Sequence, residues 1–143
     1  MDDIRWDRAL LNGLFVWLLT LVIWALPAVL YAYSLSATGS PDAPNYATLF
    51  TRLGGEVGVL YGQNWLLMVA LIIITAVLVF WRARVVARGT WNLRWVNGLI
   101  VGAVPAVLSL SFVLCGGWNW LTAAAAAAHL VAGLLGGLTA RPT

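Results

Sequence analysis

The stretch LTAAAAAAHLVAGLLGGL, residues 121–138, decides the fold of this chain. Six consecutive alanines lead to His129, the only histidine among 143 residues, and glycines follow at positions 133, 136 and 137. The segment meets the requirement of about 20 apolar residues for crossing a hydrocarbon core about 30 Å thick. Because its side chains are so small, another helix can approach its backbone closely. The stretch therefore predicts a transmembrane helix that packs through small residues.

The composition is that of an integral membrane protein. Hydrophobic residues make up 62% of the chain and charged residues 9%, whereas a soluble domain carries about a quarter charged residues. Three further apolar segments have spanning length, which predicts an all-α, integral membrane four-transmembrane-helix bundle in one domain, residues 1–143. The predicted spans are residues 9–33, 58–81, 96–115 and 118–138.

The placement of arginines predicts the orientation. All eight basic residues are arginines, and seven of them lie before the first span, in the Arg/Trp loop 82–95 or after the last span, while Arg52 lies on the other side. By the positive-inside rule the bundle is N-in/C-in, a multi-pass protein of the plasma (inner) membrane with both termini cytoplasmic. Four arginines of the loop are expected to contact lipid head groups or a partner: Arg82, Arg84, Arg88 and Arg94.

Residues 34–57 form the predicted outer loop between the first two spans. Within this loop, apolar residues recur at helical spacing, at Tyr46, Leu49, Phe50 and Leu53. The spacing predicts a short amphipathic interfacial helix over about 45–54, lying on the outer leaflet. A re-entrant plug over a cavity is the alternative interpretation.

Small residues recur every four positions in three of the spans. Lipid tails are as apolar as leucine, so helices in a bilayer associate where their backbones come close. We expect these residues to pack the helices of the bundle against each other. Because three such faces exceed what one internal seam needs, they also favour a partner interface. The residues are Gly58 and Gly62 in the second span, Gly98, Gly102 and Ala106 in the third, and Gly133 and Gly137 in the fourth.

His129 lies near the middle of the last span, where an ionisable residue indicates a functional site. Three interpretations stay open. In the first, the imidazole forms a hydrogen bond to a neighbouring helix, where Thr75, Ser109 and Ser111 offer hydroxyl groups. In the second, it is the axial ligand of a tetrapyrrole that lies on the flat alanine and glycine surface. In the third, it serves a quinone site or a proton relay.

The spacing of Ala125 and His129 resembles the AxxxH pattern of bacterial antenna polypeptides, which bind bacteriochlorophyll. The resemblance covers five residues and implies His129 as the axial ligand, with Ala125 against the ring. Trp17 and Trp24 lie seven residues apart, deep in the first span. Because hydrocarbon offers an indole N–H no acceptor, these two residues are expected to face a cofactor, a partner or the bundle interior. The implied cofactor is haem or bacteriochlorophyll.

The sequence favours a non-enzymatic accessory or structural subunit of a larger membrane complex. The predicted spans contain no acidic residue, and the sequence offers no nucleophile with a base at a catalytic spacing and no metal-ligand set. The expected partners are other integral membrane subunits, lipids or further copies of the chain, and not nucleic acid. Two alternatives stay open: a tetrapyrrole-binding subunit of an electron-transfer or light-harvesting complex, and a small homo-oligomeric channel or holin-like pore.

Overall fold

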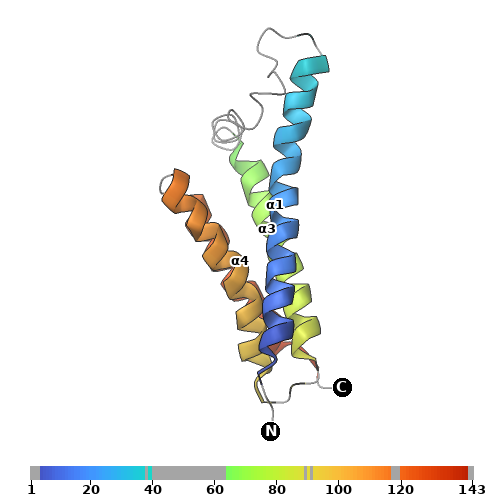
Figure 1. Ribbon diagram of the computed structural model, residues 1–143, viewed down its shortest axis with the longest axis vertical. Helices are drawn as coiled ribbons and strands as arrows, with labels where there is room; N and C mark the ends of the chain where they lie inside the picture. Colours follow the sequence, from blue (N-terminus) through green and yellow to red (C-terminus); the bar gives the residue numbers. More distant parts are fainter. Residues whose placement is uncertain are drawn as a thin grey trace. The chain divides into compact units, whose positions relative to one another are not determined.

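The computed structural model describes residues 4–37, 39, 64–88, 90, 92–116 and 120–141. These residues form α-helices and no strand, so the fold is all-α, as predicted (Figure 1). The predicted interfacial helix at 45–54, as well as Gly58 and Gly62, lie outside the described residues. The described helices are α1 (Trp6–Ala37), α3 (Trp65–Ala87), α4 (Arg94–Gly116) and α5 (Trp120–Leu138).

Three of the described helices are long and apolar enough to cross a membrane. They are α1 over Trp6–Tyr31, α3 over Trp65–Ala87 and α5 over Trp120–Leu138, while α4 has a shorter apolar stretch over Arg94–Leu110. By the length and composition of these helices, the chain is a membrane protein. Exposed tryptophans lie at or next to the first residue of each described helix, a placement typical of the aromatic belt of membrane proteins: Trp6, Trp65, Trp95 and Trp120.

Helix α3 continues six residues beyond the predicted end of the second span at Trp81. The added residues are arginine, alanine and valine, and arginine and alanine are strong helix formers, so nothing in this segment stops the helix. The prediction that 82–95 is a loop is therefore wrong at both ends. Arg82 and Arg84 are helical, and α4 already begins at Arg94.

The chain divides into two compact units. Residues 1–20 and 72–143 form the first, and residues 21–71 form the second. The first, which we call the bundle unit, contains the start of α1, most of α3, and all of α4 and α5. The second contains the remainder of α1 and the start of α3, and its buried side chains include Ala28, Met68 and Leu71.

The core of the bundle unit is made of small apolar side chains. Two buried clusters each join three helices, which brings the backbones of α1 and α3 close to their neighbours. The first cluster holds Ala9, Ala83, Val86 and Val101. The second holds Val16, Val79 and Ala132. Gly13 of α1 continues this close packing, because a Cβ at that position would come within 2.7 Å of the Val104 Cβ in α4.

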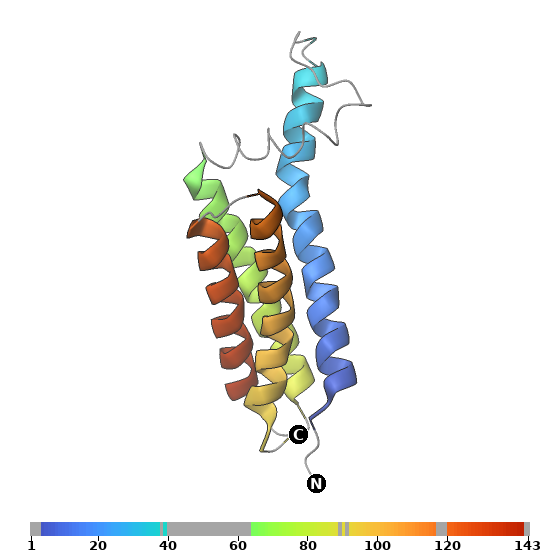
Figure 2. The same cartoon turned by 60° about the vertical axis from the view of Figure 1, so that its left-hand side comes forward.

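Helices α4 and α5 run antiparallel with their backbones in contact (Figure 2). A Cβ added at Gly98 would come within 2.5 Å of the Gly133 carbonyl oxygen, and one at Gly133 would come within 2.6 Å of the Gly98 carbonyl oxygen. Gly102 meets the His129 carbonyl oxygen in the same way, and Gly137 meets that of Arg94. We call this contact the glycine seam, after Gly98, Gly102, Gly133 and Gly137.

The glycine seam uses the small-residue faces of α4 and α5 within the chain. Ala106 is also buried, one turn beyond Gly102. Gly136 abuts the Phe80 carbonyl and Ala83 of α3, so α5 has small residues toward two neighbouring helices. The small faces of α4 and α5 thus lie against other helices of the same chain, and the surplus that favoured a partner interface is not found on these two helices.

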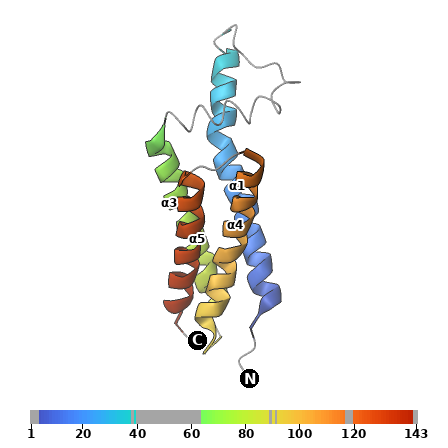
Figure 3. The same ribbon diagram turned by 90° about the vertical axis from the view of Figure 1, so that its left-hand side faces the viewer.

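Polar contacts fasten the helices at one end of the bundle unit, where α1 and α4 begin and α3 and α5 end (Figure 3). The fully buried Asn97 of α4 accepts the Arg5 N–H at Oδ1, with a distance of 3.1 Å, and its Nδ2 donates to Thr90 Oγ1 at 3.3 Å. Thr90 Oγ1 in turn donates to the carbonyl of Ala87 at 2.9 Å. Because seven arginines lie at or near this end, we call it the arginine end; they are Arg5, Arg8, Arg82, Arg84, Arg88, Arg94 and Arg141.

Enlarging a residue of the glycine seam should destabilise the bundle. We expect Gly102→Ala to lower the free energy of unfolding by about 1–3 kcal/mol, the usual cost of overpacking, and Gly133→Leu to cost more because two backbones must separate. Unfolding by SDS titration in mixed micelles measures this effect. Ala127→Leu, at an exposed position of α5, is the control and should change stability by no more than about 0.5 kcal/mol. Equal losses in all three variants would show that the seam is not a packing contact.

Candidate functional site

His129 is enclosed in the bundle unit, with 1% of its surface exposed. The alanines that precede it carry almost no bulk, so α4 lies directly against the α5 backbone at this level. The carbonyl oxygen of His129 packs against Gly102, while its imidazole reaches toward α3. The smallness of the surrounding residues therefore closes the bundle around the histidine.

The imidazole is hydrogen-bonded to Thr75, one of the three hydroxyl-bearing residues that the sequence analysis considers as its partner. His129 Nε2 lies 3.0 Å from Thr75 Oγ1, and Thr75 is fully buried. Thr75 Oγ1 also donates to the carbonyl oxygen of Ile72 at 3.1 Å. Because a hydroxyl group has a single proton, we assign Nε2 as the donor and Thr75 Oγ1 as the acceptor. The hydrogen bond joins α5 to α3.

Three polar side chains occupy one level of the bundle unit. The second apolar cluster of the core marks a neighbouring level on α1, α3 and α5. One helical turn farther from the arginine end, these helices carry Thr20, Thr75 and His129, of which Thr20 is 6% exposed. We call these three residues the polar layer. It places polar groups from three helices inside an otherwise apolar core.

The polar layer is only partly hydrogen-bonded. Within the part of the chain that the structure describes, His129 Nδ1, Thr20 Oγ1 and the nearby Trp17 Nε1 are buried without a hydrogen-bond partner. A buried polar atom left unpaired costs about 1–3 kcal/mol. The apolar packing on either side therefore holds the layer in place. This arrangement makes His129 a contact between helices, enclosed by its own chain.

The residues predicted to bind a tetrapyrrole are distributed over the two units. Ala125 and His129 are both buried on α5, and α4 covers the flat face at the glycine seam. Trp17 is half-buried in the bundle unit, and the half-buried Trp24 belongs to the other unit. The surface that could accept a helix or a planar ring lies against α4 at the glycine seam.

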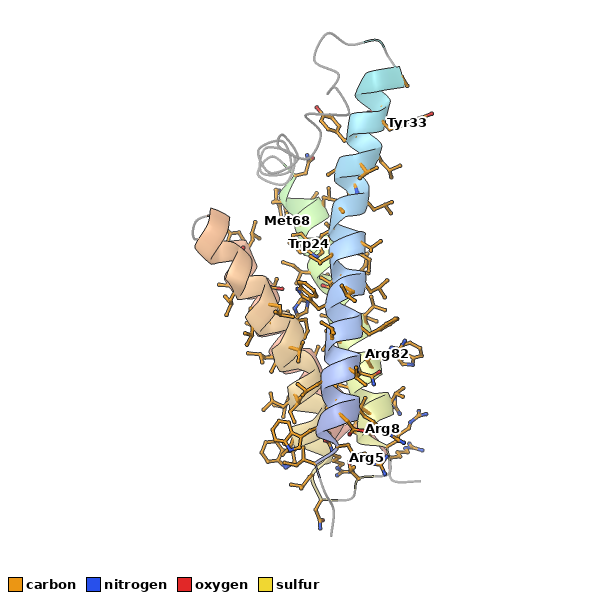
Figure 4. All side chains as sticks on the ribbon, viewed as in Figure 1. Arg5, Arg8, Trp24, Tyr33, Met68 and Arg82 are labelled. Atoms are coloured by element: carbon orange, nitrogen blue, oxygen red, sulfur yellow. The ribbon has the colours of Figure 1, made fainter. Side chains whose placement is uncertain are left out.

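The four arginines predicted to contact lipid or a partner have different surroundings. Arg94 donates from Nη1 to the Ala140 carbonyl oxygen at 3.2 Å, so it fastens α4 to the end of α5. Arg84 is half-buried, and its Nε is enclosed without a hydrogen-bond partner among the described residues. Arg88 is exposed at the end of α3. The Arg82 guanidinium lies over the Phe15 ring, 4.4 Å from its centroid, and over the Trp81 ring at 5.1 Å (Figure 4).

Sequence reasoning missed Thr20, Phe15 and the buried role of Asn97. The small or short side chains of α1 offered a signal for Thr20, because Ala9, Gly13 and Thr20 fall on one side of a helix. No comparable pattern marks Phe15, since it is one apolar residue among many. Asn97 lies near the end of a predicted span, a position typical of interfacial or capping residues, so no signal indicated its burial.

No protein-family model, curated protein or solved structure matches this chain. Among the described residues, no group of three or more histidine, cysteine, aspartate or glutamate side chains is placed to hold a metal ion.

The hydrogen bond between His129 and Thr75 should stabilise the bundle. Thr75→Val removes the hydroxyl with little change in volume. We expect it to lower the free energy of unfolding by about 0.6 kcal/mol, the average measured for hydrogen bonds between membrane helices, and by no more than about 1.7 kcal/mol, the largest measured value. In a His129→Ala background the same change should cost less, because the donor is already gone. A double-mutant cycle in mixed micelles measures this coupling, with Thr139→Val, on an exposed residue, as the control. Purely additive losses would contradict the assigned bond.

Proposed function

We propose that this chain is a non-enzymatic structural subunit of a larger membrane complex. The observation that carries the proposal is the enclosure of His129, which is bonded to α3 and covered by α4. An ionisable residue inside a membrane is by default a candidate for catalysis or transport. Here the imidazole instead joins two helices of its own chain, which supports a role in holding the bundle together.

We also propose that all four described helices span the plasma membrane, with both termini in the cytoplasm. Helix α4 has 23 residues and therefore a length of about 35 Å, enough to cross the hydrocarbon core. The clustering of arginines at the arginine end supports the orientation, because basic residues are enriched on the cytoplasmic side. The starts of α1 and α4 and the ends of α3 and α5 all lie there (Figure 3).

Helix α1 is the proposed partner surface. Its packed side within the bundle unit is narrow and made of short residues, Ala9, Gly13, Val16 and Thr20. The rest of its circumference exposes large apolar side chains, including Leu10, Leu11, Leu14, Phe15 and Leu18. Because the glycine faces of α4 and α5 are used within the chain, α1 offers the apolar surface on which another membrane helix would pack. The proposed partner is therefore another integral membrane protein.

Site-specific photo-crosslinking in native membranes tests this assignment. A photoreactive amino acid at Leu11 or Leu18, both exposed on α1, should give an adduct of one defined mass with another membrane protein. The matched control is Val131, which is 55% exposed on α5 and should give no such adduct. The two α1 positions are 65% and 51% exposed, so the three sites are comparably accessible.

The same experiment identifies the contrary case. Adducts with lipid alone at all three positions would show a bundle that acts without a protein partner, and the proposed function would be wrong. Protein adducts at Val131 but not on α1 would contradict the assignment of α1 as the partner surface.

A further inference from the structure

The geometry points to a second kind of site at the arginine end. We propose that Arg82, which lies on α3 against Phe15 of α1, binds the phosphate of an anionic phospholipid head group. This inference goes beyond the proposed subunit function, because it requires no protein partner and holds for either orientation in the membrane. All of the residues involved belong to the bundle unit.

Two aromatic rings hold the Arg82 side chain. Its guanidinium lies over the rings of Phe15 and Trp81, with centroid distances of 4.4 and 5.1 Å. Stacking on aromatic rings fixes the plane of a guanidinium and leaves the N–H groups at its edge able to donate. A planar guanidinium in this arrangement matches the bidentate geometry of phosphate oxygens.

The charged residues near Arg82 favour an anionic ligand. Among the described residues Asp7 is the only acid, and Arg82 forms neither an ion pair nor a hydrogen bond with any of them. Arg8 lies seven residues before Phe15, so it is on the same side of α1 as the ring that carries Arg82. Figure 4 shows both arginines toward the arginine end. Two cations on this side without a described carboxylate partner favour an anionic ligand.

The position of Arg82 along α3 and the apolar side chains near it favour a lipid over a soluble phosphate. Arg82 lies five residues before the end of α3, which is about 8 Å along the helix, and Trp81 beside it is typical of the membrane interface. Exposed apolar side chains continue on the Trp81 side of α3, at Val77 and Ile74, four and seven residues before Trp81. An acyl chain can lie along these side chains while the head group meets the arginine.

The surroundings of Arg82 differ from those of the other three arginines, Arg84, Arg88 and Arg94. Arg94 uses its guanidinium to bind the Ala140 carbonyl, and Arg84 has its Nε enclosed. Arg88 is exposed, and no aromatic ring among the described residues holds it. A site-specific role therefore belongs to Arg82, whereas Arg88 contributes charge alone. This difference supplies a matched control, because Arg82 lies on α3, Arg88 directly follows the last residue of α3, and both lose one charge when replaced by glutamine.

Native mass spectrometry of the full-length chain, purified in detergent with mixed phosphatidylglycerol and phosphatidylcholine, measures the lipid that is retained. We expect the wild-type chain to retain phosphatidylglycerol in preference to phosphatidylcholine. Arg82→Gln should lower the retained phosphatidylglycerol by at least about ten-fold, the factor that corresponds to about 1.5 kcal/mol for the charged hydrogen bonds that the held guanidinium donates to the phosphate. Arg88→Gln should change it by less than about two-fold.

Two further variants keep the proposal testable if Arg82→Gln fails to fold. Phe15→Leu preserves the charge and removes the stacked ring, and Arg82→Lys preserves the charge and removes the planar fork. Both should reduce phosphatidylglycerol retention, whereas unchanged retention in both would overturn the proposal. Equal losses in Arg82→Gln and Arg88→Gln would also overturn it, because they would indicate a general charge effect.

Inorganic phosphate distinguishes the two sources of the ligand. An excess of inorganic phosphate should leave phosphatidylglycerol bound, because the acyl chains contribute apolar contacts that free phosphate lacks. Displacement of the lipid by inorganic phosphate, with the same dependence on Arg82, would identify a site for soluble phosphate and overturn the lipid assignment.

Discussion

The close approach of the α4 and α5 backbones is the contact on which the rest of the structure depends. Water drives apolar surfaces together in a soluble protein, but lipid does not, so membrane helices associate where packing is tight. The glycine seam provides that tightness, with carbonyl oxygens of one helix against glycines of the other. It places α4 against one side of His129 and leaves α3 as the neighbour that the imidazole can reach. Gly136 then allows α3 to approach α5 from another side.

The all-α fold and its four described helices can be predicted from the sequence, because the length of an apolar segment is a local property. The periodicity of small residues predicts Gly98, Gly102, Gly133 and Gly137 as packing residues, and in the structure they lie where α4 meets α5. It cannot tell which stripe meets which, since every small-residue stripe has the same spacing. The excess of small faces therefore favoured an external partner, although α4 and α5 use theirs on each other and on α3. The end of α3 was also missed, because a change from apolar to basic residues marks a membrane boundary without ending a helix.

The candidate site, too, can be predicted from the sequence only in part. The sequence limits the partners of His129 to a few hydroxyl groups, and the structure selects Thr75. The unpaired Thr20 and Trp17 atoms beside it depend on the register of α1 against its neighbours, which no local pattern encodes. The stack of Arg82 on Phe15 joins residues far apart in the chain and needs the same register. The core of the bundle unit is therefore closed by internal contacts, and the functional surfaces that we propose lie outside it, on the apolar side of α1 and at the arginine end.

The most direct test of this account asks whether the glycine seam forms within one chain in a bilayer. Spin labels at Val107 on α4 and Val131 on α5, both exposed, would report the separation of the two helices in a Cys115→Ala background. The account predicts one short distance, consistent with axes at the near end of the usual range of about 8–10 Å, and this distance should persist when labelled protein is diluted with unlabelled protein. A distance that disappears on dilution would place the contact between chains, and a broad distribution would mean that the seam does not form.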